Sequence, residues 1–190
     1  MQRVPDLEVV FCASEPGELR TDNGMLGVMA DVALAEIPAP EVVLVPGGIG
    51  SRAAMRDPAL LNWLAQAHHT SRYTTSVCTG ALVLAAAGLL DGLTATTHWA
   101  AREILREYGA QPVEQRVVTH ADQRIITAAG VSAGIDMALQ LVAELYDDTA
   151  AKAAQLFIEY DPQPPFDSGS LERAAPEVRA RLGEYRRRRQ

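Results

Sequence analysis

Residues 73–88 read YTTSVCTGALVLAAAG, and this stretch decides the fold of the chain. Its first five residues form a β-branched run typical of a buried strand, and the Ala/Leu-rich run that follows is typical of a helix ending at Gly88. A lone cysteine, Cys78, stands between the two runs. A sharp strand-to-helix turn requires small residues two positions before and two positions after its central residue, where this chain has Ser76 and Gly80. The stretch therefore predicts a nucleophile elbow with Cys78 at its tip.

Two interpretations of Cys78 follow from this local pattern. The unpaired N–H groups at the start of the following helix favour negative charge on the sulfur, and the thiolate is the reactive form of cysteine. On this interpretation Cys78 is a nucleophile. Most free cysteines, however, are small buried hydrophobes, and Cys78 would then simply close a strand. The local pattern alone favours neither interpretation.

The composition is that of one globular domain. A chain of 190 residues with 48% hydrophobic and 22% charged residues is large enough to bury about 70% of its unfolded surface without a metal or a disulfide. The two cysteines, Cys12 and Cys78, fall in segments that we place on different strands, so free thiols in a reducing compartment are the simpler expectation. The chain does not open on a basic stretch followed by an apolar run, and no apolar window approaches about 18 residues. We therefore expect a cytoplasmic protein with no membrane partner.

The charge pattern argues against nucleic acid as a partner. The net charge is −7, whereas phosphate contacts need clustered Lys and Arg. The four arginines at 186–189 are an exception, and a run of this kind at a chain end is usually a solvated tail. No pair of histidines or carboxylates has the spacing of a metal site, so we predict no metal and no cofactor.

Hydrophobic periodicity predicts alternating strands and helices. Buried parallel strands are expected at 7–12 (LEVVFC), 41–45 (EVVLV) and 73–77, and a β-hairpin from 115–119 and 124–128. Residues 24–34 are expected to form a pair of short strands, with a helix as the alternative. Helices are expected at 57–69, 79–87, 99–108, 132–146, 147–160 and 174–189, with a Pro-rich loop at 161–170. Asp57 and Ser132 are the expected caps of two of these helices. The inner face of the helix at 132–146 is expected at Ile135, Ala138, Leu139, Val142, Leu145 and Tyr146.

These elements predict an α/β layered fold with a largely parallel sheet, in a single domain over residues 1–190. Its core is expected over about residues 7–170, followed by the charged helix at 174–189. Ligands of such folds bind beyond the carboxyl ends of the strands. Both Cys78 and the pair Gly47-Gly48 fall at such ends, so the two are expected in one site.

The glycine-rich stretch after the second strand is a candidate oxyanion hole. Gly47 and Gly48 would let backbone N–H groups approach a developing anion without a Cβ in the way. An N–H from this loop and the N–H of Thr79 would together face one atom bonded to Cys78. The alternative is a tight strand-to-helix turn with no role in binding, which the glycines alone favour. The stretch lacks the Lys-Ser/Thr ending of a phosphate-binding loop.

A nucleophilic cysteine usually needs a base, and four histidines are available. We expect surface roles for His68 and His69, on a polar helix face, and for His120, in a turn. His98 ends a short strand and is the candidate that reaches the site. Its alternative role is a structural hydrogen bond at a helix start, and the sequence favours that role.

At this point the chain resembles the ThiJ/PfpI superfamily, of the class I glutamine amidotransferase-like proteins. Within it, Thr79 after the cysteine and the TTHW element point to isocyanide hydratases and to the ligand-sensing domains of AraC-type regulators. The segment 159–170 (EYDPQPPFDSGS) is similar to the tail of the hydratases and favours them. The matching stretches are 45–48 (VPGG), 76–92 (SVCTGALVLAAAGLLDG), 96–99 (TTHW) and 129–136 (AGVSAGID).

The resemblance implies a flavodoxin-like three-layer sandwich and a homodimer. It also implies that the Cys78 thiolate attacks the terminal carbon of an isocyanide, and that water hydrolyses the resulting thioimidate to an N-substituted formamide. Thr79 would support the site through its N–H and hydroxyl, and Gly47 and Gly48 would line it. The alternative is a ligand- or redox-sensing domain without a DNA-binding module.

One departure from the family concerns the opening of the chain. Family members begin with an extra strand that carries an acid in a pattern like Leu-Asp-x-x-Gly-Pro, whereas residues 1–6 read MQRVPD. Loss of a strand from the middle of a parallel sheet would expose unpaired backbone groups. Two explanations follow: a start codon further upstream, which we favour, or a truncated and impaired remnant.

Overall fold

The computed structural model describes residues 4–187. It divides into two compact units, Met1–Phe157 and Ile158–Gln190, and each is described by itself. The first unit contains every strand in the described part of the chain. The division does not decide whether the chain is one domain, which stays a prediction.

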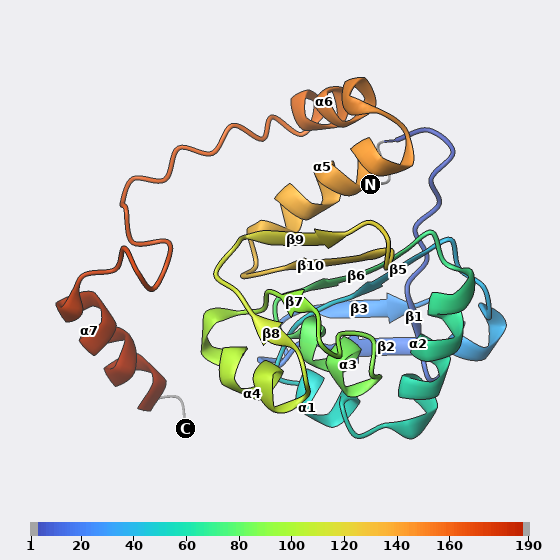
Figure 1. Cartoon of the computed structure of the whole chain (residues 1–190), viewed down its shortest axis with the longest axis horizontal. Helices are drawn as coiled ribbons and strands as arrows, with labels where there is room; N and C mark the ends of the chain where they lie inside the picture. The colour runs from blue at the N-terminus through green and yellow to red at the C-terminus, as the bar shows by residue number, and fades with distance from the viewer. Residues whose placement is uncertain (1–3, 188–190) are drawn as a thin grey trace. The chain divides into compact units, whose positions relative to one another are not determined.

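The centre of the first unit is a four-stranded sheet in the order β5-β6-β10-β9 (Figure 1). Its strands are β5 (Val42–Val45), β6 (Tyr73–Val77), β10 (Ile125–Ala128) and β9 (Val117–His120). β6 runs parallel to both of its neighbours, and β9 returns antiparallel to β10 as a hairpin. The predicted mainly parallel sheet and the predicted hairpin are confirmed.

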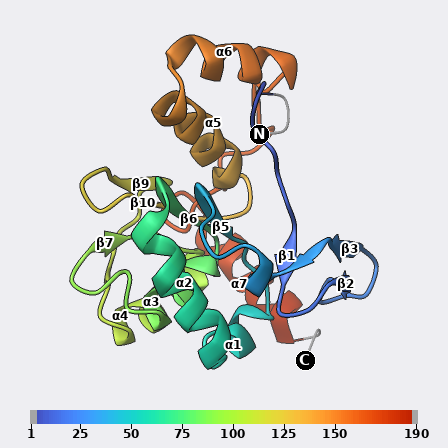
Figure 2. The ribbon, with the colours of Figure 1, turned by 90° about the vertical axis from the view of Figure 1, so that its right-hand side faces the viewer.

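Helices cover both faces of this sheet, so the first unit is the predicted three-layer sandwich (Figure 2). On one face lie α2 (Pro58–Thr70), α3 (Gly80–Ala86) and α4 (Arg102–Glu107), and on the other lies α5 (Ala133–Leu145) with α6 (Asp148–Phe157) packed on it. Each face has its own apolar cluster. The first contains Val43, Leu64, Leu82 and Ile125, and the second contains Ile126, Ala128, Met137 and Leu141.

Residues 7–12 are not the buried strand that the sequence predicts. Only β1 (Cys12–Ala13) is extended, and it pairs in parallel with β4 (Val32–Ala33) outside the central sheet. Val10 and Phe11 are exposed at 40% and 52%. A strand needs a neighbour to take its backbone hydrogen bonds, and β5 forms the edge of the central sheet without this segment. The apolar run therefore has β-strand composition but lacks the pairing that would make it a strand.

The predicted short strands within 24–34 are present as β3 (Gly27–Ala30) and β4. β3 forms an antiparallel hairpin with β2 (Gly17–Arg20), a partner that the sequence did not indicate. A 3-10 helix, η1 (Leu34–Glu36), then leads toward β5. The hairpin turn lies at residues 21–26, and its contacts bear on the site described below.

One of the two predicted helix caps is present, and the buried face of α5 differs from the prediction. Asp57 caps α2 as predicted, since its carboxylate accepts the N–H groups of Ala59 and Leu60. Ser132 precedes α5 but makes no side-chain cap. The inner face of α5 is also out of phase with the prediction, because α5 is apolar on more than one side. It buries Ala133, Met137, Leu141 and Val142, whereas Ile135 and Tyr146 are exposed.

The remaining elements connect these layers. They are α1 (Ser51–Ala54) after β5, β7 (Thr94–Ala95) paired with β8 (Gln111–Pro112), and η2 (Trp99–Ala101) before α4. The second unit contains α7 (Pro176–Arg187). Of the terminal arginine run, Arg188 and Arg189 lie outside the described residues.

Candidate active site

Cys78 lies at the tip of a sharp turn between β6 and α3. Its φ is 57°, a left-handed conformation that non-glycine residues rarely adopt. The N–H of Cys78 donates to the carbonyl of Ala128 at 3.0 Å, and the Thr97 hydroxyl donates to the carbonyl of Cys78 at 2.8 Å. Both backbone groups are therefore held in place while the side chain stays half-buried. The predicted elbow conformation is present.

The neighbouring glycines are required by close packing. A Cβ on Gly80 would lie 2.1 Å from the carbonyl oxygen of Val45, at the end of the adjacent strand. A Cβ on Gly47 would lie 2.7 Å from the Cβ of Cys78 and 2.8 Å from the amide nitrogen of Thr79. The loop after β5 thus packs directly on the elbow, and the structure brings Gly47, Cys78 and Thr79 together.

Thr79 and Gly48 form a two-way hydrogen bond. The Thr79 hydroxyl donates to the carbonyl of Gly48 at 3.0 Å, and the N–H of Gly48 donates to that hydroxyl oxygen at 2.9 Å. The Gly48 N–H is therefore engaged within the protein. The N–H groups of Gly47 and Thr79, in contrast, donate no hydrogen bond to any residue between 4 and 187. These two groups are the ones that a ligand at the elbow can use.

His98 has a structural role in the described contacts. Its Nδ1 accepts the N–H of Ala100 at 3.3 Å at the start of η2, and its ring contacts that of Trp99 in a tilted arrangement with centroids 5.3 Å apart. It follows Thr97, which bonds the carbonyl of Cys78, so its backbone lies next to the elbow. A chemical role for His98 stays a prediction.

Two of the other histidines make structural contacts, whereas His69 is exposed as predicted. His68 is half-buried, and its Nδ1 lies 3.0 Å from the Thr74 hydroxyl. Burial lowers the pKa of His68, and the positive charge of Arg124 lowers it further. His120 ends β9, with Nε2 2.8 Å from the carbonyl of Thr94. Neither histidine is simply a surface residue.

The second thiol differs from Cys78 in its surroundings. Cys12 lies on β1, and burial raises its pKa above the ordinary value. Since the thiolate is the reactive form, Cys12 is a poor nucleophile at neutral pH. Both cysteines are free.

Sequence reasoning missed an acidic residue beside the glycine loop. Asp22, in the turn between β2 and β3, accepts the N–H of Ile49 at 3.0 Å through Oδ2. The same oxygen lies 3.7 Å from the position of a Cβ on Gly48. The contact joins residues 27 positions apart, so no local pattern indicates it.

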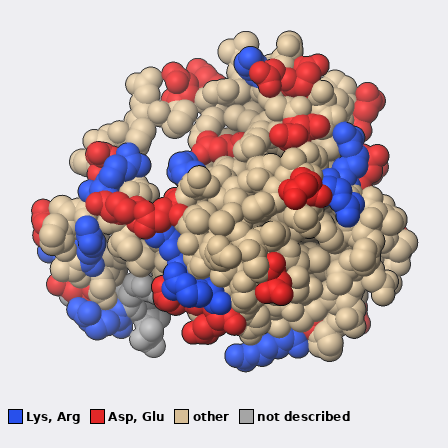
Figure 3. Space-filling model, in the orientation of Figure 1, with Lys and Arg blue, Asp and Glu red and all other residues tan. Residues whose placement is uncertain are grey.

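Neither the geometry of a metal site nor that of a membrane span is found among the described residues. Among residues 4–187 no group of three or more His, Cys, Asp or Glu side chains is arranged to hold a metal ion. None of the helices described is long and apolar enough to span a bilayer. On the face shown in Figure 3, acidic and basic side chains are interspersed.

Comparison with known proteins identifies the family. The model of the DJ-1/PfpI family matches residues 2–144. The chain belongs to the DJ-1/PfpI family. The predicted ThiJ/PfpI membership is therefore confirmed.

Two relatives illustrate the functional range of DJ-1/PfpI proteins. The chain is 42% identical to isonitrile hydratase from Pseudomonas putida over 175 residues, which cover 92% of this chain and 75% of the hydratase. It is 32% identical to the HTH-type transcriptional regulator CdhR from Pseudomonas aeruginosa over 147 residues, 77% of this chain but only 43% of the regulator.

A solved structure supports the fold. A ThiJ/PfpI family protein from Pseudomonas syringae superposes with a TM-score of 0.87 at 40% identity, covering 94% of this chain and 73% of that protein. The predicted α/β fold class is thereby confirmed.

Proposed function

We propose that this protein hydrates an isocyanide to an N-substituted formamide, with Cys78 as the nucleophile. The observation that carries the proposal is the placement of a half-buried thiol on a left-handed turn, beside two amide N–H groups, those of Gly47 and Thr79, that have no partner among the described residues. The 42% identity to a hydratase supports the choice of substrate class.

The reaction divides into two additions. The Cys78 thiol adds across the terminal carbon of R–N≡C, so that a carbon–sulfur bond forms and the thiol proton ends on that carbon, giving the thioimidate R–N=CH–S–Cys. Water then adds across the carbon–nitrogen double bond. The carbon–sulfur bond breaks, the thiol is restored and R–NH–CHO leaves. Covalent catalysis replaces one difficult hydration by two easier steps.

The backbone of the site has a defined part in this scheme. The N–H groups of Gly47 and Thr79 would donate to the negative charge that develops on the substrate. The Thr79 hydroxyl would hold Gly48, and with it the glycine loop, against the elbow. His98 would lie at the margin of the site, with its Nδ1 engaged at η2.

From the resemblance to the family we also propose a homodimer that acts on a small molecule, and from charge and composition a cytoplasmic protein with no nucleic acid or membrane partner. The free cysteines agree with a reducing compartment. Sedimentation of the purified chain measures its oligomeric state directly, and a monomer at micromolar concentration would contradict the dimer.

The test of the activity compares the two cysteines. Purified wild-type protein and the variants Cys78→Ala and Cys12→Ala are incubated with an aliphatic and an aromatic isocyanide, and the formyl proton of the product is followed by NMR. We expect turnover by the wild type and by Cys12→Ala, and none by Cys78→Ala. Turnover that survives Cys78→Ala, or an inactive wild type, would overturn the proposal.

A second candidate function is ligand or redox sensing, favoured by the similarity to a transcriptional regulator. Accessible reactive thiols are the ones that oxidise. Mild peroxide followed by peptide mass spectrometry separates the two functions. Stoichiometric sulfinate at Cys78, in a protein that does not turn over isocyanides, would support the sensor.

A further inference from the structure

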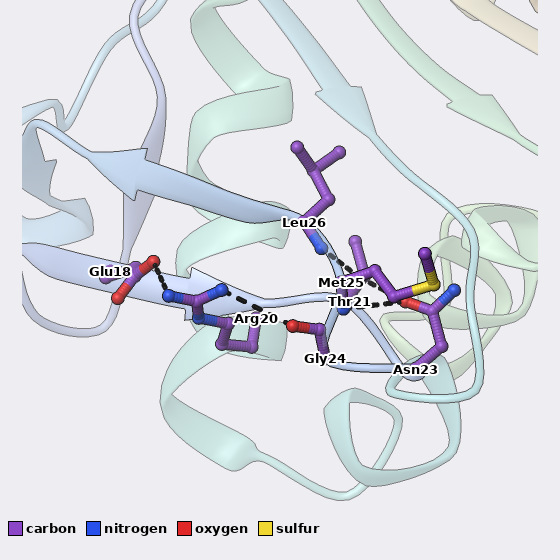
Figure 4. Close-up of polar contacts among 7 residues, drawn as sticks. All are labelled: Glu18, Arg20, Thr21, Asn23, Gly24, Met25 and Leu26. Carbon is purple, nitrogen blue, oxygen red and sulfur yellow. Dashed lines mark hydrogen bonds and ion pairs between the residues drawn. The ribbon is translucent and has the colours of Figure 1, made fainter.

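The turn between β2 and β3 is held rigidly by its own hydrogen bonds (Figure 4). The N–H of Thr21 donates to the carbonyl of Leu26 at 2.9 Å, and the N–H of Gly24 donates to the carbonyl of Thr21 at 2.7 Å. The side chain of Asn23 accepts from the Thr21 hydroxyl at 2.9 Å and from the N–H of Met25 at 3.0 Å. These bonds order the backbone on both sides of Asp22, from which its carboxylate reaches the glycine loop.

The carboxylate of Asp22 bonds to the glycine loop of the candidate active site. Oδ2 accepts the N–H of Ile49, which directly follows Gly48. On the other side of Gly48, the Thr79 hydroxyl bonds both its N–H and its carbonyl. Gly48 is thus fixed from two directions, by the elbow on one side and by the hairpin on the other.

These contacts matter because the loop at residues 47–50 is rich in glycine and therefore conformationally flexible when it is not held by hydrogen bonds. Gly48 has a φ of 145°, in a region open mainly to glycine, and Gly47 and Gly50 are its near neighbours. Glycine has more conformational freedom to lose on ordering than any other residue. The Ser51 hydroxyl also donates to the carbonyl of Gly48 at 2.7 Å, and the bond from Ile49 to Asp22 adds the one anchor that comes from the hairpin.

We propose that Asp22 is a positioning residue of the active site. It acts through the N–H of Ile49 to hold the loop of Gly47 and Gly48 against the elbow, and so aligns the free amide groups with the sulfur of Cys78. This inference rests on the proposed function for its effect on turnover. Its effect on the loop and on the reactivity of Cys78 is independent of which substrate the protein takes.

The test separates the hydrogen bond from the charge. Asp22→Ala removes the acceptor, whereas Asp22→Asn keeps an oxygen that can accept the N–H of Ile49 and removes only the charge. Asp31→Ala is the matched control, since Asp31 is an exposed acid directly after β3 whose side chain makes no hydrogen bond to the rest of the described chain.

Three measurements are made on each protein. They are hydrogen exchange at the Ile49 amide, the rate constant and stoichiometry of Cys78 alkylation by iodoacetamide from pH 6 to 9, followed by peptide mass spectrometry, and kcat and KM for an isocyanide. We expect Asp22→Ala to speed exchange at Ile49, to change the pH profile of alkylation, and to lower kcat by about tenfold with little change in KM. Asp22→Asn should stay within about threefold of the wild type, as should Asp31→Ala.

The outcomes are distinct. If the wild type does not hydrate isocyanides, the proposed function fails, and exchange and alkylation alone decide the role of Asp22. If Asp22→Ala lowers only the stoichiometry of alkylation, with an unchanged rate constant per reactive site, Asp22 merely supports folding and the positioning role is overturned. The same conclusion follows if Asp22→Asn is as impaired as Asp22→Ala, because the effect would then belong to the charge.

Discussion

At the scale of single residues, Gly80 shows how closely the elbow packs on the neighbouring strand. A methyl group there would meet the Val45 carbonyl oxygen at 2.1 Å, and a backbone atom cannot move aside cheaply. We expect Gly80→Ala to lower the free energy of unfolding by about 1–3 kcal/mol, as overpacking does in well-packed cores. Urea denaturation measures the change. Gly130→Ala is the control, because a Cβ on Gly130 meets no atom within 4 Å, and equal losses in both variants would contradict the packing argument.

Substitutions at two adjacent buried hydroxyls on β6 are expected to change the stability of the fold in opposite directions. The hydroxyl of Thr75 donates to the carbonyl of Val43 at 3.0 Å, whereas that of Ser76 has no hydrogen-bond partner among residues 4–187. Thr75→Val removes this hydrogen bond from the core and should lower the free energy of unfolding by about 0.5–1.5 kcal/mol. Ser76→Ala removes a buried polar group and should be neutral or stabilising. Thermal melts of both variants test the pair, and a larger loss for Ser76→Ala would refute the assignment.

The site could be predicted from the sequence where its residues are neighbours along the chain, or where they follow strands of the same parallel sheet, as Gly47 and Cys78 do. Cys78, Thr79 and Gly80 are neighbours in sequence, and the turn they form constrains residue size at fixed positions. Asp22 reaches Ile49 across 27 positions, and Thr97 reaches Cys78 across 19. No periodicity or motif records such contacts, so they appear only when the fold brings the segments together.

At the scale of elements, apolar runs predicted strands correctly where a partner strand was available. The run at 41–45 gave β5 and that at 73–77 gave β6, because each pairs within the central sheet. The run at 7–12 has the same composition, but only Cys12 and Ala13 find a neighbour, in β4. A β-branched, apolar composition shows that a segment can form a strand, but the segment becomes one only where a neighbouring strand pairs with it.

His68 on α2, which contacts Thr74 on β6, is expected to make the stability of the fold depend on pH. Burial and the charge of Arg124 lower the pKa of His68 from its ordinary value of 6.5. Between the lowered and the ordinary value the unfolded chain binds more protons than the folded one, so stability falls as pH drops below about 6.5. We expect His68→Gln to show a smaller fall in Tm from pH 7.5 to 5 than the wild type.

The control for this dependence is His69→Gln, at the exposed neighbouring position on the same helix. It should keep most of the wild-type dependence, because burial is the largest cause of the lowered pKa of His68 and the charge of His69 is the smallest. Parallel pH profiles for the wild type and His68→Gln would show that other groups cause the loss of stability.

At the scale of the whole molecule, the division into two units predicts where a protease cuts first. Residues 160–175 contain no helix or strand, residues 161–169 are all exposed, and Phe166 is 79% exposed. Proteases cleave such segments well before they cleave paired strands or packed helices, which must first open. Brief treatment with chymotrypsin should therefore cut after Tyr160 or Phe166 and leave a fragment that contains the central sheet and Cys78.

Mass spectrometry locates the cuts, and the fragment should still melt cooperatively when it is followed by circular dichroism. The double variant Tyr160→Ser/Phe166→Ser should slow the first cleavage, and a first cut inside residues 42–145 would show that the first unit is less stable than its packing indicates.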